Sequence, residues 1–267
     1  SKSIERAQKK VEENNFGIRK RLLEYDDVMN KQREIIYTKR KHALFGERLS
    51  LDVTNMIYDT CFNIVNQNHE FKDFDTYNQD IMRILTISSP VNEEEFTSKT
   101  ENEILDLTYN SCIENYKTKS SNIASMVLPQ IKEVFKNQSA TYKNIVIPFT
   151  DGVKTLQVTA DLEQSVTSEG GNIATEIEKG VTLAIIDDFW KDHLREMDDL
   201  KQSVQNAVYE QKDPLLIYKF EAIDLFKVVM SKINQDIVSF LLKAGIDGGD
   251  QKIKEEKTAI QKVNLQT

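Results

Sequence analysis

The sequence predicts a mainly α-helical protein with one small β-hairpin, and three observations support this prediction. Glycine and proline are scarce, with nine and four copies in 267 residues, which favours long helices over a turn-rich sandwich or barrel. Apolar residues recur every three or four positions over long stretches near both ends of the chain. Around Asp151 and Gly152 the pattern changes to two β-rich runs, which is typical of a hairpin.

The first 48 residues are expected to form one long helix. Residues 4–44 contain no proline and a single glycine, Gly17. Their apolar stripe includes one polar position, Gln32, which leaves the helical period intact. A helix of this length reaches roughly 60 Å at 1.5 Å per residue, so it must bridge several packed bodies or run along something outside the chain. The stripe consists of Ala7, Val11, Ile18, Leu22, Tyr25, Met29, Gln32 and Ile36.

Residues 49–144 are expected to form a compact subdomain of shorter amphipathic helices, with residues 53–65 and 75–86 as two of them. Asn92 precedes three glutamates and is suited to cap a helix start, because carboxylates favour the positive N-terminal end. Thr100 with Glu103 predicts a capping box before the next apolar run. Pro129 lies inside a helical pattern and predicts either a helix start or a kink.

Residues 145–172 are expected to be a β-hairpin insertion, and residues 173–246 an antiparallel pair of long helices, here called the finger. A hairpin alone is marginal in water, so it should pack on a neighbour. Asp213 before Pro214 favours a helix start, and Gly245 should end that helix. Residues 247–267 are polar and expected to form a flexible tail. The two finger stripes are Ile186, Trp190, Leu194, Met197, Leu200 and Val204, then Leu216, Phe220, Ile223, Met230, Ile233, Ile237 and Leu241.

The histidines and cysteines give no sign of a catalytic or metal centre. His42, His69 and His193 lie far apart and lack metal-ligand spacing with Cys61 and Cys112. The chain has no CxxC and no phosphate-binding glycine motif, and two lone thiols suit a reducing cytosol. No apolar run approaches the ~20 residues that span a bilayer, and no signal peptide is expected. We therefore expect no catalytic residue, metal or cofactor in this chain.

The candidate contact site is the loop between the two finger helices. Tyr209 lies in this loop rather than on a stripe, with Val208 beside it, and an exposed tip could contact something passing by. The alternative is a tyrosine folded back to cap the helical pair. Trp190, by contrast, lies on an apolar stripe, so core packing is favoured over a role as a partner anchor.

Charge is unevenly distributed along the chain. Residues 1–41 carry twelve Lys/Arg against seven Asp/Glu, which is a net charge of +5. The remaining residues therefore carry −13, and the chain as a whole carries −8. A basic segment joined to an acidic body could dock on an acidic protein or on anionic lipid, and a solvated helix face is the alternative. The acidic balance argues against nucleic acid as a partner.

Two separate runs, in the right order, resemble the SecA family of preprotein translocase ATPases. Residues 4–12, 15–33 and 36–37 resemble the long helix of its helical scaffold domain. Residues 190–202, 209–214 and 218–221 resemble its two-helix finger. Residues 49–144 match its helical wing domain by position and helical character. The resemblance implies a C-terminal fragment without the family's nucleotide-binding domains, and residues 145–171 look like an insertion between wing and finger.

The resemblance implies a function as the substrate-handling and scaffold portion of a motor that moves unfolded preproteins through the SecYEG channel. The finger-tip residues Asn206, Ala207, Val208 and Tyr209 are expected to contact the translocating polypeptide. The tip is less basic than the family's pattern and lacks its glycine before the tyrosine. No C-terminal Cys/His zinc motif is present, so the family's contact with the chaperone SecB is not assigned.

The same resemblance implies partners, cofactors and a location. SecYEG, the unfolded preprotein and other SecA domains are the expected partners, with anionic lipid and a second copy as further candidates. ATP and magnesium are expected to bind elsewhere in the parent protein, and this fragment is not expected to be an enzyme. The expected location is the cytoplasm and the cytoplasmic face of the bacterial inner membrane.

Two other interpretations stay open at this point. The chain could be a purely structural scaffold, in which the long helix relays motion and the finger merely packs. It could also be an independent hydrolase that uses His193 with Asp192 or Glu196, which predicts catalysis by the isolated chain.

Overall fold

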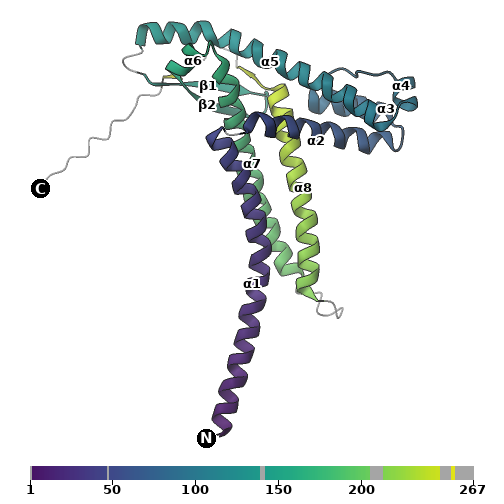
Figure 1. The fold of residues 1–267 in the computed structure, drawn as a ribbon, viewed down its shortest axis with the longest axis vertical. Coiled ribbons are helices and arrows are strands. Elements are labelled where there is room, and N and C mark those ends of the chain that lie inside the picture. Colours follow the sequence, from purple (N-terminus) through teal and green to yellow (C-terminus); the bar gives the residue numbers. More distant parts are fainter. Residues whose placement is uncertain (1, 47, 139–141, 205–212, 247–253, 256–267) are drawn as a thin grey trace, which may run out of the picture. The chain divides into compact units, whose positions relative to one another are not determined.

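The computed structural model describes residues 2–46, 48–138, 142–204, 213–246 and 254–255 (Figure 1). Most of these residues are helical, and a small antiparallel sheet makes up the rest of the regular structure, as the sequence predicts. The chain divides into two compact units, Ser1–Lys41 with Ile186–Ile233, and His42–Ile185 with Asn234–Thr267. The helical elements are α1 (Lys2–Phe45), α2 (Leu49–His69), α3 (Phe74–Asp80), the π-helix η1 (Ile81–Leu85), α4 (Glu93–Ser98), α5 (Glu101–Gln138), α6 (Leu162–Thr167), α7 (Gly171–Ser203) and α8 (Pro214–Lys243).

The predicted long helix is confirmed as α1, which has 44 residues and therefore extends about 66 Å at 1.5 Å per residue. It ends where Gly46 and Arg48 both adopt positive φ angles, 70° and 62°, which helical residues do not. The predicted apolar stripe of α1 is only half buried. Its members from Tyr25 to Ile36 are buried or half-buried, whereas those from Ala7 to Leu22 are exposed.

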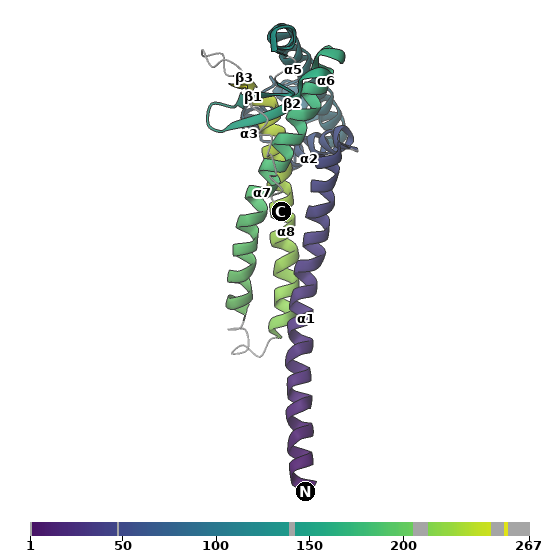
Figure 2. The same cartoon turned by 90° about the vertical axis from the view of Figure 1, so that its left-hand side faces the viewer.

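The first unit consists of α1 up to Lys41 and of the parts of α7 and α8 that flank residues 205–212. These three helices run alongside one another, and the first turns of α1 extend past the ends of the other two (Figure 2). The predicted stripe of α7 is confirmed, since all its members are buried or half-buried. The antiparallel pair follows from the short connection between α7 and α8.

The predicted stripe of α8 is wrong in its first half. Leu216, Phe220 and Ile223 are 53%, 63% and 49% exposed. The buried face at this end of α8 instead passes through Tyr218 and Ala222. Apolar side chains occur on more than one side of α8, so helical periodicity by itself does not select the side that a neighbour covers.

The second unit contains α2 to α5, and its local capping signals are confirmed. Asn92 accepts a hydrogen bond from the Glu95 amide, and the Glu95 side chain accepts one from the Asn92 amide, which completes a capping box. Thr100 and Glu103 exchange the same type of hydrogen bonds at the start of α5. A helix start at Pro129 is wrong, because α5 continues through it. Cys61 and Cys112 are free, buried thiols.

The predicted hairpin is confirmed as β1 (Asn144–Thr150) and β2 (Thr155–Asp161), which pair antiparallel from Asn144↔Asp161 to Thr150↔Thr155. Gly152 adopts a φ of 89° in the turn, and the Asp151 carboxylate accepts two backbone N–H bonds there. The other edge of β1 pairs with two short strands that the sequence pattern does not predict, β3 (Gly245–Ile246) and β4 (Lys254–Glu255). Gly245 does end α8, as expected, and then begins β3.

Candidate functional site

The predicted tip residues Asn206, Ala207, Val208 and Tyr209 lie outside the described residues. The structure describes the two helix ends that hold them, Val204 on one side and Asp213 on the other. Both ends belong to the first unit. The candidate site is therefore built from the helix ends and from what fastens them to α1.

The first turn of α8 is capped as the sequence predicts. The Asp213 carboxylate accepts a hydrogen bond from the Leu215 amide at 3.0 Å, which satisfies one of the unpaired N–H groups of the helix start. Pro214 follows as the first helical residue, where its missing N–H removes no helical hydrogen bond. A capped helix start therefore directly follows residues 205–212.

A small apolar cluster joins this end of α7 and α8 to α1. Tyr25 of α1 and Tyr218 of α8 contact each other with ring centroids 4.8 Å apart. Met197 and Leu200 of α7 and Val204, which directly follows α7, are also part of the cluster, and Ala222 belongs to it on α8. Aromatic pairs in this geometry add to the free energy gained from burial.

Charged groups surround the tyrosine pair. The Lys201 ammonium lies 5.7 Å from the centre of the Tyr25 ring and 3.9 Å from the Asp26 carboxylate. Burial, together with the nearby carboxylates of Asp198 and Asp26, raises the pKa of Tyr218 to about 12. Tyr218 is therefore a neutral, structural tyrosine at neutral pH.

A buried polar layer lies deeper in the same unit, formed by Gln32 of α1, His193 of α7 and the main chain of α8 at Ala222. The Gln32 side-chain amide donates to the Ala222 carbonyl at 2.9 Å. Its oxygen is 2.9 Å from His193 Nε2, and because an amide oxygen only accepts, His193 must donate. His193 and Gln32 are 1% and 5% exposed.

Sequence reasoning missed this layer, although one signal for it was visible. Gln32 is the polar member of an otherwise apolar stripe, and a buried amide requires hydrogen-bond partners. Its partners are 161 and 190 residues away along the chain. Periodicity therefore indicates that Gln32 is buried but cannot identify what it binds.

His193 does not have the surroundings of a catalytic base. Its Nε2 is bonded to Gln32, and its Nδ1 is buried with no hydrogen-bond partner among the described residues. Asp192 pairs instead with Arg195 at 2.8 Å. Burial lowers the pKa of His193, and the charge of Glu196 opposes this only in part. These contacts do not support the hydrolase interpretation.

Trp190 belongs to the core, as the sequence favoured. It is buried, and its ring centroid lies 5.6 Å from that of His193. Phe226 of α8 contacts the same imidazole at 5.7 Å between centroids. Across the described ranges, no group of three or more His, Cys, Asp or Glu side chains is arranged to hold a metal ion.

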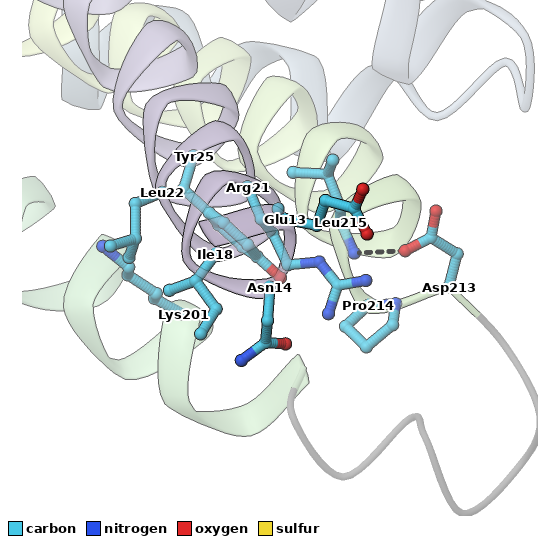
Figure 3. Close-up of a pocket in the computed structure, with 11 residues that line it drawn as sticks. Glu13, Asn14, Ile18, Arg21, Leu22, Tyr25, Lys201, Asp213, Pro214 and Leu215 are labelled. Atoms are coloured by element: carbon cyan, nitrogen blue, oxygen red, sulfur yellow. Dashed lines mark hydrogen bonds between the residues drawn. The ribbon is translucent and has the colours of Figure 1, made fainter. Parts of the chain in front are cut away.

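A groove of about 570 Å³ lies beside the helix ends (Figure 3). Ile18 and Leu22 of α1 and Leu215 of α8 give it apolar walls, and the side chains of Arg21 and Lys201 add positive charge. Glu13 and Asp213 contribute negative charge. The groove thus combines apolar surface with charges of both signs next to the ends of the finger helices.

Comparisons of the sequence with known proteins identify a family and several relatives. Residues 1–245 match the family model described as "SecA Wing and Scaffold domain". The chain is 52% identical to the protein translocase subunit SecA of Christiangramia forsetii, over 100% of this chain and 24% of that protein. It is 50% identical to the SecA of Flavobacterium psychrophilum, over 99% of this chain and 24% of the relative. The SecA of Bacteroides thetaiotaomicron is 48% identical over 92% and 22% of the two chains.

The chain thus spans about a quarter of the length of the relatives that it matches. None of the helices within the described ranges is long and apolar enough to cross a bilayer.

Proposed function

Because the chain belongs to the SecA family, in which it matches the wing and scaffold region, we propose that it is the substrate-handling and scaffold portion of a protein-translocating motor. In this proposal residues 1–48 are the scaffold helix, 49–144 the wing, 145–172 an insertion, 173–246 the finger and 247–267 a tail. ATP and magnesium bind in the remaining part of the parent protein, and the chain transmits the resulting motion.

The observation that supports this function best is the fastening of the finger to α1 close to the tip. The tyrosine pair and the α7 residues around it hold both helix ends against one long helix. Helix ends that are fastened in this way move with α1 rather than independently of it. This is the mechanical requirement for a part that follows a motor and handles a substrate.

We propose that the tip residues 206–209 contact the translocating polypeptide. Tyr209 is the large side chain among them, and a tyrosine offers an apolar ring and one polar group, so it can contact many sequences without selecting one. The neighbouring groove, with apolar walls and charges of both signs, suits an unfolded chain of mixed composition.

The proposed partners are the SecYEG channel, the unfolded preprotein and the other domains of the parent protein. Anionic lipid and a second copy are further proposed partners, the first because residues 1–41 carry an excess of five positive charges. The proposed location is the cytoplasm and the cytoplasmic face of the inner membrane.

Site-specific crosslinking in the full-length protein tests the tip contact. A photo-reactive phenylalanine analogue at Tyr209 should crosslink to a preprotein stalled during translocation. The control carries the same analogue at Val153, which is 90% exposed in the hairpin turn of the second unit and should crosslink weakly. Equal crosslinking at both positions, or none at Tyr209, would contradict the contact.

The second candidate function is a structural scaffold that relays motion without touching the substrate, and the buried polar layer between α1 and the finger favours it. This function predicts no preprotein crosslink at Tyr209, together with a translocation defect when the layer is altered.

A further inference from the structure

We propose that Gln32 and His193 form a register lock, which fixes the position of α1 along α7 and α8 and allows the finger to move only when both hydrogen bonds break. The register claim stands on geometry alone. Its consequence for translocation rests on the proposed function.

Burial at the positions of Gln32 and His193 does not require polar side chains. The layers on either side are apolar and aromatic, with Tyr25, Met197 and Tyr218 on one side and Trp190 and Phe226 against the imidazole. Well-packed apolar side chains would be at least as stable there, because burying a polar group is unfavourable until it is hydrogen-bonded. The polar pair therefore calls for another explanation.

The two hydrogen bonds of Gln32 run in opposite directions, since its oxygen accepts one and its nitrogen donates the other. His193 Nε2 donates to the Gln32 oxygen, and the Gln32 nitrogen donates to the Ala222 carbonyl. Gln32 of α1 thus accepts a hydrogen bond from α7 through its oxygen and donates one to α8 through its nitrogen. This requirement can be met at only one position of α1 relative to both partners.

The apolar contacts by themselves do not specify the position of α1 along α7 and α8. The buried stripe of α1 repeats at intervals of three or four residues, with Tyr25, Met29 and Ile36 around Gln32. Sliding by one helical turn, about 5.4 Å, would replace one apolar contact by another. The same slide would leave the Gln32 amide and the His193 N–H buried without partners, which is unfavourable for each group. A single buried polar residue specifies register in coiled coils by this mechanism.

The surroundings of the His193 imidazole favour one protonation state and one tautomer. Trp190 and Phe226 contact the ring, and its Nδ1 is buried with no hydrogen-bond partner among the described residues. A proton on Nδ1 would find no acceptor there, so the neutral ring that donates through Nε2 is favoured. The lock therefore has one closed form.

The test compares single and double variants in the full-length protein. Gln32→Leu and His193→Phe each leave one partner unsatisfied, and each should speed amide exchange of residues 193–204 and 214–226 roughly tenfold. The double variant has an all-apolar layer and should recover most of this protection. Gln67→Leu, the same change at an exposed position of α2 outside this junction, should alter nothing.

Register is measured separately by spin labels at Glu34→Cys on α1 and Lys219→Cys on α8, two exposed positions of the first unit, with other reactive cysteines replaced. The parent should give one narrow distance distribution. The double variant should give a broad one, or a second peak displaced by about one helical turn. A double variant that keeps a single narrow distribution, or single variants whose effects simply add, would overturn the lock.

Translocation by the same double variant separates this proposal from the proposed function. A loosened register with a translocation defect and intact ATP hydrolysis supports both. A loosened register with normal translocation supports the lock and contradicts mechanical transmission through this junction.

Discussion

Tyr218 lies at the base of the finger, and its ring contacts Tyr25 across two helices that are far apart in the sequence. Two positions further along α8, Phe220 is 63% exposed. The two aromatic residues have similar size and helix position but opposite surroundings. They form a matched pair for measuring how much burial at this junction contributes to stability.

We expect Tyr218→Ala to lower the free energy of unfolding by roughly 3–5 kcal/mol, since it leaves a cavity and removes the ring contact. Phe220→Ala should change it by about 0.5 kcal/mol or less, as for other exposed positions. Denaturant unfolding of both variants against the parent measures the difference. Equal losses would show that the junction is not the stabilising contact.

The half-buried Lys119 should make the unfolding free energy of the second unit depend on pH. Burial lowers the pKa of Lys119 from its usual 10.5 to about 8, and its ammonium donates to the Leu242 carbonyl at the end of α8. Between these two pH values the unfolded chain binds more protons than the native chain, so this group makes stability rise with pH from about 8 toward 10.5. Below about 8 both states are protonated and the contribution is constant.

The difference in unfolding free energy between the parent and Lys119→Met, followed from pH 7 to pH 9.5, isolates this contribution. The parent should gain stability relative to the variant as the pH passes 8. A constant difference in unfolding free energy over this range would show that the pKa of Lys119 is not lowered.

At the scale of elements, helix ends follow local chemistry closely. Asn92, Thr100 and Asp213 each cap the helix that the sequence predicts for them. The signals are short-range, because a cap and the amide that it satisfies lie two or three residues apart. The same holds for Asp151 in the hairpin turn.

Asp213→Ala should lower the free energy of unfolding by about 1 kcal/mol and fray the first turn of α8, because it removes the cap from the Leu215 amide. Asp224→Ala removes another exposed carboxylate, which lies within α8 and pairs with Lys227, and should cost less. Amide exchange of residues 215–217 is the measurement. Similar exchange in the two variants would argue against the cap.

The chain spans about a quarter of the length of the relatives that it matches, and the first half of α1 exposes apolar side chains. Val11, Phe16, Ile18 and Leu23 are among its exposed apolar side chains. This many exposed apolar side chains on one helix are unusual in an isolated soluble protein and favour association. In the parent protein we expect other domains to cover it.

The isolated chain of 267 residues should therefore self-associate through α1. Phe16→Lys with Leu23→Lys should shift it toward the monomer with little change in unfolding free energy, because both side chains are exposed. Sedimentation at several concentrations measures the shift. Lys substitutions at Phe71 and Val153, exposed in the second unit, are the control and should leave association unchanged.

The sequence by itself determined the helices, their caps, the hairpin and the family, because each depends on residues close together in the chain or on a motif read in order. Tertiary structure decided which half of the α1 stripe and which half of the α8 stripe is buried. Ile18 and Tyr25 lie on one stripe of α1, yet Ile18 is exposed and Tyr25 is buried against Tyr218. It also decided that Gln32 bonds to His193 and that β3 and β4 extend the hairpin. Periodicity shows which face of a helix is apolar, but burial and hydrogen bonding depend on which distant segment packs against that face.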